Sequence, residues 1–270
     1  MRAELEKEKD RFMERYDFET QPSILIQGAM ESETQYMIGQ LEEAECVTLG
    51  NYKYYTGFLG KYREPVIISR TYQGMVNAAA ATILALTYFA PKAVINQGIA
   101  GGHAPEIHLG NILIGERIVP MGAVMWKFGA AGAGIDAQGF GPLELEIFNK
   151  ARGETEKIVD FPCDERLLAA AERVKSPYRT MRGVIGSADE WNNQLDRIAL
   201  LRERYQTMAE EMESAAMAQL CVSYGTPFIG VRIISNSIVN GEEYDESVGT
   251  DIQKFVIAYV EELNGFACES

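Results

Sequence analysis

Short apolar runs alternate along the chain with stretches of helical periodicity. Runs of strand length occupy residues 23–27, 52–60, 65–70, 93–97, 111–118, 180–187 and 227–236, with 47–50 as a possible partner strand. Helical patterns occupy residues 29–44, 76–89, 166–174, 196–205, 209–221 and 252–263. Strands that alternate with helices predict one α/β domain with a mostly parallel sheet. We expect this domain to span residues 23–270, after a helical extension over residues 1–22.

Composition and charge narrow the possible functions. The chain has 270 residues, is 47% hydrophobic and carries a net charge of −14. An acidic balance disfavours nucleic acids and anionic membranes as partners, because both bind clustered lysine and arginine. The charged N-terminus has no apolar segment of signal-peptide length, which favours a cytoplasmic protein. The four cysteines form no CxxC pair and no HExxH motif occurs, so no metal or cofactor is expected.

Polar and glycine-rich segments follow several of the predicted strands. Glu31 and Glu33 follow the first strand, GIAGG (98–102) follows the run 93–97, and Asn236 ends the run 227–236. Segment 189–193 likewise follows a strand. In open parallel α/β sheets, ligands bind outside the carboxyl ends of the strands. The pattern therefore predicts one binding site built from these segments.

A second acidic pair, Glu211 and Glu213, stands where an alanine-rich helix is predicted to begin. Carboxylates at a helix N-terminus commonly stabilise the helix through its dipole. Taken alone, the pair is as compatible with helix capping as with ligand binding.

Six segments together resemble a known superfamily. They are GAMESE (28–33), INQGIAGG (95–102), LGNILIGE (109–116), RGVIGSADEW (182–191), EEMESAAMAQLC (210–221) and PFIGVRIISN (227–236). In order and spacing they resemble the nucleoside phosphorylase superfamily, and most of all its hydrolytic branch, the 5'-methylthioadenosine/S-adenosylhomocysteine nucleosidases. The resemblance covers about residues 23–264 and implies a three-layer α/β/α sandwich around a mixed, mostly parallel sheet.

The resemblance implies hydrolysis of the bond between ribose C1' and a purine, through an oxocarbenium-like state. Such chemistry needs a carboxylate that activates water, groups that stabilise the departing base, and carboxylates that hold the sugar hydroxyls. By position, Glu33 corresponds to the water-activating base and Glu213 to the residue that binds the 2' and 3' hydroxyls. Glu211 and Met212 correspond to neighbours of the ribose, and Arg232 to a charge that organises this cluster.

The remaining implied contacts concern the base and the 5' group. The glycine loop contributes Ala100, Gly101 and Gly102. Trp191 occupies the position of an aromatic residue that stacks on the base. Asn192 beside it offers backbone contacts to the purine edge. The wall around the 5' substituent corresponds to Met30, Met125, Phe128 and Tyr244. Members of this family are commonly dimers in which the neighbouring subunit helps to close that pocket, so a homodimer that binds a purine nucleoside is expected.

Two residues depart from the family pattern. Asn236 occupies the position of the aspartic acid that protonates purine N7 in adenine-specific nucleosidases, and an amide cannot supply that proton. Either adenine nucleosides react slowly, or the base is a 6-oxopurine, as in inosine or futalosine, whose O6 and N7 can pair with the amide. Gln73 replaces an apolar neighbour of the 5'-thio group. It is either a solvated loop residue or a sign of a polar 5' substituent.

The acidic GAMESE segment disfavours phosphate as the nucleophile, since phosphorylases surround phosphate with cations. We therefore expect a hydrolase acting on a 5'-modified adenine nucleoside. The alternatives are a 6-oxopurine nucleoside hydrolase or phosphorylase, and a nucleoside-binding or storage protein with weak catalysis. His103 and His108 flank the glycine loop without a nucleophile motif nearby, which favours surface or structural roles.

Overall fold

The computed structural model describes residues 23–264 and 266; the predicted extension 1–22 lies outside them. The strands are β1 (Ile24–Gly28), β2 (Glu42–Leu49), β3 (Tyr52–Leu59), β4 (Glu64–Arg70), β5 (Ala93–Gly102), β6 (Ile112–Pro120), β7 (Val124–Trp126), β8 (Phe140–Pro142), β9 (Leu145–Asn149), β10 (Glu154–Ile158), β11 (Phe161–Pro162), β12 (Thr180–Ser187), β13 (Thr207–Glu211) and β14 (Phe228–Asn236). The helices are α2 (Gln35–Ile38), α3 (Met75–Phe89), α4 (Glu165–Glu172), α5 (Leu195–Tyr205), α6 (Ser214–Tyr224) and α7 (Gly249–Glu262), with 3-10 turns η1 (Ile238–Asn240) and η2 (Glu246–Val248).

A ten-stranded mixed sheet forms the centre of the molecule. Strand β1 pairs in parallel with β4 and β5, and β5 pairs in parallel with β14. The edge strands β2 and β3 are antiparallel. Pairing also runs from β5 through β13, β12, β6 and β14 back to β5, so five strands close into a ring. The ring brings the carboxyl ends of β5, β13 and β14 together.

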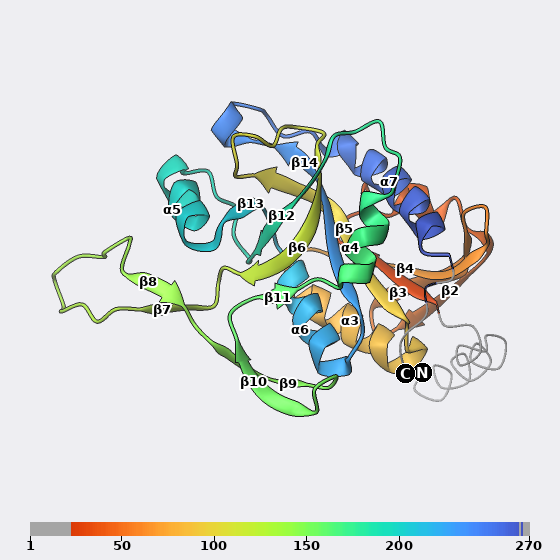
Figure 1. The fold of residues 1–270 in the computed structure, drawn as a ribbon, viewed down its shortest axis with the longest axis horizontal. Helices are drawn as coiled ribbons and strands as arrows, with labels where there is room; N and C mark the ends of the chain where they lie inside the picture. The colour runs from red at the N-terminus through yellow and green to blue at the C-terminus, as the bar shows by residue number, and fades with distance from the viewer. Residues whose placement is uncertain (1–22, 265, 267–270) are drawn as a thin grey trace.

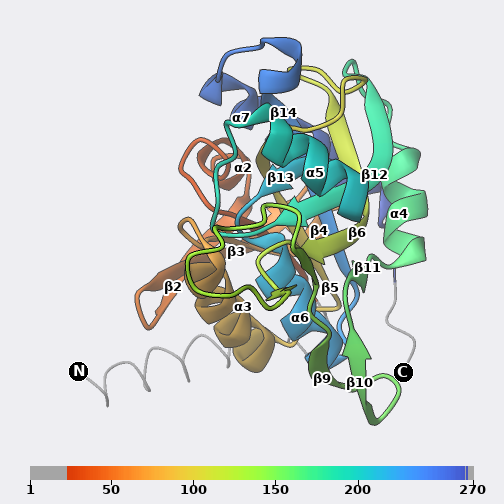
Figure 2. The ribbon, with the colours of Figure 1, turned by 90° about the vertical axis from the view of Figure 1, so that its left-hand side faces the viewer.

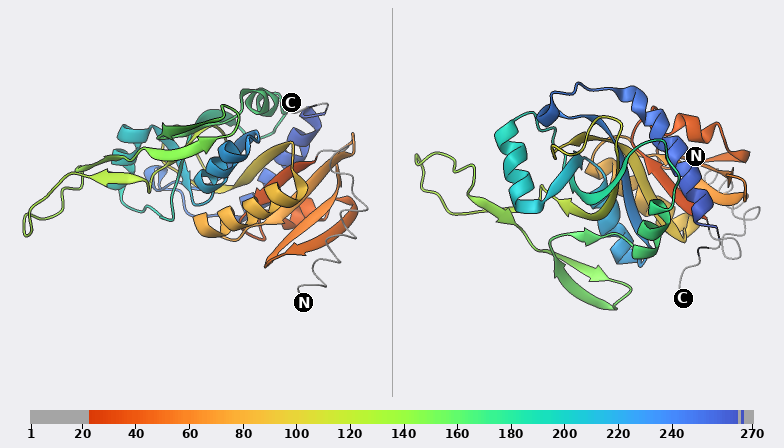
Figure 3. Two further views of the ribbon diagram at one scale, coloured as in Figure 1. Left: turned by 90° about the horizontal axis from the view of Figure 1, so that it is seen from below. Right: turned by 45° about the horizontal axis from the view of Figure 1, so that its top comes forward.

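Helices pack on opposite faces of this sheet (Figures 1 and 3). Helices α3 and α6 contact each other on one face, whereas α7 contacts α2 and α4 on the other. The strands between them are almost fully buried: every residue of β1 is buried, as are the apolar residues of β14. Burial on both faces explains why these strands appear as continuous apolar runs. The observed α/β/α arrangement confirms the predicted fold class.

A long hairpin projects from the body (Figures 1 and 2). Strands β7 and β8 pair antiparallel at its base, and the glycine-rich loop between them carries side chains that are mostly exposed. A second antiparallel pair, β9 and β10, follows it in the chain. Neither of these two strand pairs was predicted from the sequence. Within the described part of the chain, no helix combines the length and apolar character needed to cross a bilayer.

Three predicted elements are wrong in detail. The helix expected over 29–44 shrinks to the four residues of α2, because the chain from Glu42 pairs with β3 instead. Segment 98–102, expected as a loop after the strand 93–97, is the end of β5, where it pairs with β13 and β14. The helix expected from residue 209 begins only at Ser214, since residues 207–211 form strand β13.

Candidate active site

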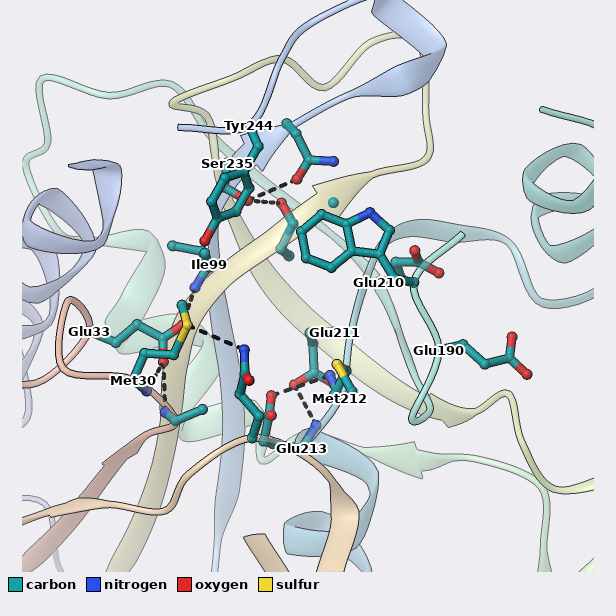
Figure 4. A pocket seen from close by; sticks show the side chains of 16 residues that line it. Met30, Glu33, Ile99, Glu190, Glu210, Glu211, Met212, Glu213, Ser235 and Tyr244 are labelled. Carbon is teal, nitrogen blue, oxygen red and sulfur yellow. Dashed lines mark hydrogen bonds between the residues drawn. The ribbon is translucent and has the colours of Figure 1, made fainter. Parts of the chain in front are cut away.

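An open cavity of about 570 Å³ lies where β1, β5, β13 and β14 end (Figure 4). Its lining residues are Ala29, Met30, Glu33, Gln73, Ile99, Ala100, Gly101, Glu190, Trp191, Glu210, Glu211, Met212, Glu213, Ser235, Asn236 and Tyr244. Segments that are far apart in sequence thus meet at one site, at the strand ends where the sequence predicted it. Five glutamates line this one cavity, which makes it strongly acidic.

The Glu33 carboxylate is buried at one end of the cavity and is held by backbone donors. Its Oε2 accepts hydrogen bonds from the N–H groups of Ala29 (2.7 Å) and Met30 (2.8 Å), and its Oε1 accepts from Ile99 N–H (2.9 Å). A Cβ atom on Gly98 would lie 2.4 Å from Oε1, so only glycine leaves room for this side chain. Burial raises the pKa of Glu33, although the N–H donors and the charge of Arg232 oppose the rise.

Glu211 is held by a buried cation and by the start of α6. Arg232, which is 1% exposed, donates to the Glu211 carboxylate, to Ser214 Oγ (2.9 Å) and to the carbonyl of Asn96 (2.9 Å). Glu211 also accepts from the N–H groups of Ser214 and Glu213. The capping interpretation therefore holds for Glu211, because its carboxylate satisfies N–H groups at the helix start.

Glu213 occupies the N-cap position of α6, but its side chain does not cap that helix. Instead it reaches the start of α3, where Oε1 accepts from Gly74 N–H (2.9 Å). Burial and the neighbouring Glu211 and Glu33 carboxylates raise the pKa of Glu213 to about 8. Glu213 therefore holds a proton over a pH range in which an ordinary carboxylic acid is ionised.

The opposite end of the cavity carries aromatic and amide groups. Trp191 and Tyr244 have ring centroids 5.6 Å apart and are 58% and 44% exposed. Asn236 Oδ1 lies 3.0 Å from the hydroxyl of Ser235, and its Nδ2 is 3.6 Å from where a Gly101 Cβ would stand. A flat apolar surface and a polar amide thus flank an open space over Gly101, which suits an aromatic base with polar edges.

Sequence reasoning missed Glu210, a buried carboxylate at this same end. It accepts from both the backbone N–H (2.7 Å) and the side-chain amide of Asn192. His103 Nε2 lies 3.1 Å from its Oε2, and His103 Nδ1 contacts Thr207 Oγ1 (2.9 Å). A strand, rather than a helix, over residues 207–211 would have placed Glu210 at a strand end beside the site. The structural role predicted for His103 agrees with its burial.

Five predicted site residues do not line the cavity. Met125 (62% exposed) and Phe128 (96% exposed) belong to the projecting hairpin, which extends away from this chain's own cavity. Gly102 packs against Ser237 and Ile234, and Arg232 lies behind Glu211. The N–H of Asn192, expected to contact the base, is bonded to Glu210.

Gln73 is among the lining residues, and its Nε2 lies 3.4 Å from Met30 Sδ. Gln73 is thus an exposed loop residue whose amide lies at the cavity next to a thioether, so both alternatives stay open. This position puts one polar and one apolar group side by side at the mouth.

Residues 23–269 match the sequence model of the phosphorylase superfamily. The chain belongs to that superfamily. A 5'-methylthioadenosine/S-adenosylhomocysteine nucleosidase of Aeromonas salmonicida is 32% identical over 84% of this chain and 91% of its own. A nucleosidase of the same name from Bacillus cereus is 28% identical over 89% and 99%. As a superfamily member, the chain has relatives that are N-glycosyl hydrolases.

Solved structures agree with this membership. The 5'-methylthioadenosine/S-adenosylhomocysteine nucleosidase of Neisseria meningitidis, in complex with methylthio-immucillin-A, superposes with a TM-score of 0.71 at 26% identity, over 89% of this chain and 99% of that one. The futalosine hydrolase of Helicobacter pylori has a TM-score of 0.72 at 22% identity, over 91% and 100%, and shares the fold.

Proposed function

We propose that this superfamily member is a purine nucleosidase that hydrolyses the bond between ribose C1' and the purine. The observation that carries the proposal is a buried, backbone-held Glu33 in a cavity that Glu213 also lines. In the proposed reaction the C1'–N9 bond breaks and its electron pair leaves with the base. Glu33 takes a proton from the water whose oxygen bonds to C1'. Glu213 holds the ribose hydroxyls, and Arg232 positions the neighbouring Glu211.

Hydrolysis is favoured over phosphorolysis by the charge of the site. Among the residues described, the cavity lining contains no lysine or arginine and five glutamates. A phosphate dianion in this glutamate-lined cavity would find no cationic side chain, whereas phosphate sites carry cationic donors. Water, which is neutral, is the nucleophile that this lining accepts.

Two classes of base remain as candidates, each with its own support. Similarity to nucleosidases named for methylthioadenosine and S-adenosylhomocysteine favours a 5'-modified adenine nucleoside. Asn236 favours a 6-oxopurine nucleoside, because its amide can pair with O6 and N7 but cannot protonate N7.

We further propose that the protein is a homodimer whose projecting hairpins reach the cavity of the partner copy. Met125 and Phe128 are exposed apolar side chains on that hairpin, and the cavity of their own chain stays open. Exposed apolar groups of this size are typical of interaction surfaces. In such a dimer, Met125 and Phe128 of one copy would form the wall around the 5' substituent in the cavity of the other copy. Sedimentation of the purified protein tests the dimer, and Phe128→Ser should raise KM without changing the monomer fold.

The reaction is tested by following free base from methylthioadenosine, S-adenosylhomocysteine, adenosine, inosine and futalosine, with and without phosphate. Base release without phosphate is expected. A strict phosphate requirement would overturn hydrolysis, and tight nucleoside binding without any turnover would favour a binding protein.

A further inference from the structure

Glu210 and Asn236 lie at one level of the sheet, on two of the strands that pair with β5. In the register of the sheet, Glu210 of β13 and Asn236 of β14 are both partners of Gly101. A Cβ on Gly101 would lie 3.7 Å from Glu210 Cγ and 3.6 Å from Asn236 Nδ2. The two polar side chains therefore flank a glycine that leaves the space between them open, at the end of the cavity that Trp191 also lines.

The Glu210 carboxylate is held from behind. Asn192 donates to both of its oxygens, and His103 Nε2 lies 3.1 Å from Oε2. His103 is in turn held by Thr207. A carboxylate has about four acceptor positions, so the two hydrogen bonds from Asn192 leave acceptor capacity for a group in the cavity. Glu210 lines the cavity and is only 8% exposed, so its carboxylate has little access to bulk water.

This arrangement presents a hydrogen-bond acceptor to the base in place of a donor. The Asn192 N–H is a donor that suits N1 of adenine, which is an acceptor, but that donor is already bonded to Glu210. What the cavity offers in its place is a carboxylate, which only accepts. A carboxylate facing adenine N1 would meet a lone pair, whereas a 6-oxopurine carries a hydrogen on N1.

Asn236 completes the recognition of such a base. Its Oδ1 lies 3.0 Å from the hydroxyl of Ser235, and no described residue accepts from its Nδ2. The amide NH2 is therefore available for an acceptor such as O6 of the base. O6 and N1–H are neighbours on one edge of a 6-oxopurine, which matches the neighbouring positions of Asn236 and Glu210.

We infer that Glu210 is a specificity-determining residue that accepts a hydrogen bond from N1–H of a 6-oxopurine, while Asn236 donates to O6. His103 and Asn192 are positioning residues that hold the carboxylate. The inference rests on the proposed nucleosidase function and selects between its two base classes.

The test compares nucleosides that differ only in the base: inosine with adenosine, and 5'-methylthioinosine with 5'-methylthioadenosine. The wild-type protein should favour the 6-oxopurine of each pair by about 100-fold in kcat/KM, since an unpaired buried polar group discriminates strongly. Glu210→Gln presents an amide, and should reduce that ratio at least ~10-fold. Glu203→Gln, an exposed change on α5, is the matched control and should leave the ratio unchanged.

The outcomes separate the two proposals. Equal or better cleavage of the adenine nucleosides by the wild-type protein would overturn the role of Glu210 but leave the nucleosidase function standing. Neither cleavage nor binding of any of the four, measured by base release and calorimetry, would overturn both. If Glu210→Gln does not fold, the wild-type protein is compared on inosine and 1-methylinosine, which lacks N1–H. Loss of at least ~10-fold on methylation is expected, and equal rates would overturn the inference.

Discussion

The two ends of the cavity are built differently. At the ribose end, Glu33, Glu211 and Glu213 are buried and are held mainly by backbone N–H groups and Arg232. At the base end, Trp191 and Tyr244 are about half exposed and stand on loops after β12 and β14. The ribose-end carboxylates are thus fixed by backbone donors and a buried cation, whereas the aromatic side chains of the base end are carried by loops.

This difference suggests how one fold serves several substrates. Backbone donors do not depend on side-chain identity, so the ribose end tolerates sequence change around it. Loops tolerate substitution, and functional residues concentrate on them. Glu210 and Asn236 are exceptions, because they belong to β13 and β14 but take part in the base end. The predictions below test whether the two ends are as separate as their construction indicates.

The largest effect is expected from Glu33→Gln. Loss of the proposed base should lower kcat by about 10³-fold, while nucleoside binding persists because the ribose and base contacts remain. Single-turnover base release and calorimetry measure the two quantities. Glu31→Gln is the matched control, since Glu31 is exposed and pairs with Arg70 at the surface. Full activity of Glu33→Gln would exclude it as the base.

Arg232→Met should destabilise the fold by about 3 kcal/mol, because it leaves the buried Glu211 carboxylate without its cation. Urea unfolding measures the loss. Adding Glu211→Gln should recover part of it, since the unpaired charge is then gone. If the double variant is no more stable than Arg232→Met, the ion pair does not organise this end.

Glu213→Gln should change how stability depends on pH. In the unfolded chain Glu213 ionises near the ordinary pKa of 4.5, whereas in the folded protein its pKa is about 8. The folded state therefore binds the extra proton between these values, and its stability falls as pH rises through this window. The variant lacks this titration, so between pH 4.5 and 8.5 it should lose less stability than the wild type, by up to about 5 kcal/mol. Urea unfolding at both pH values measures the difference; parallel curves would contradict it.

Trp191→Ala should have the smallest effect and act only on binding. Removing the stacking surface should raise KM by about 10-fold, with kcat and melting temperature nearly unchanged, because the side chain is 58% exposed. Trp191→Phe should restore most of the affinity. A large loss of stability or of kcat would show that the base end is coupled to the ribose end.

Much of the site was accessible from residues alone. Continuous apolar runs predicted buried strands, and polar segments after them predicted a site at the strand ends. This reasoning placed Glu33, Trp191 and Asn236 there, and the resemblance to the superfamily added Glu213; the structure brings all four to one cavity. The hairpin residues Met125 and Phe128 were assigned to the same wall, but no sequence pattern states which copy of the chain a side chain serves.

In the acidic segment 210–213, the sequence and the tertiary structure determined different features. The sequence by itself determined that carboxylates gather beside an alanine-rich helix, since that depends on residue types in order. Only the tertiary structure decided that residues 207–211 form a strand, because Met, Ala and Glu favour helix and the pairing with β5 and β12 overrides that preference. That strand directs Glu211 to Arg232 and places Glu210 beside Asn236 across Gly101. Long-range pairing of this kind is set by distant strands, so no local pattern in the chain carries it.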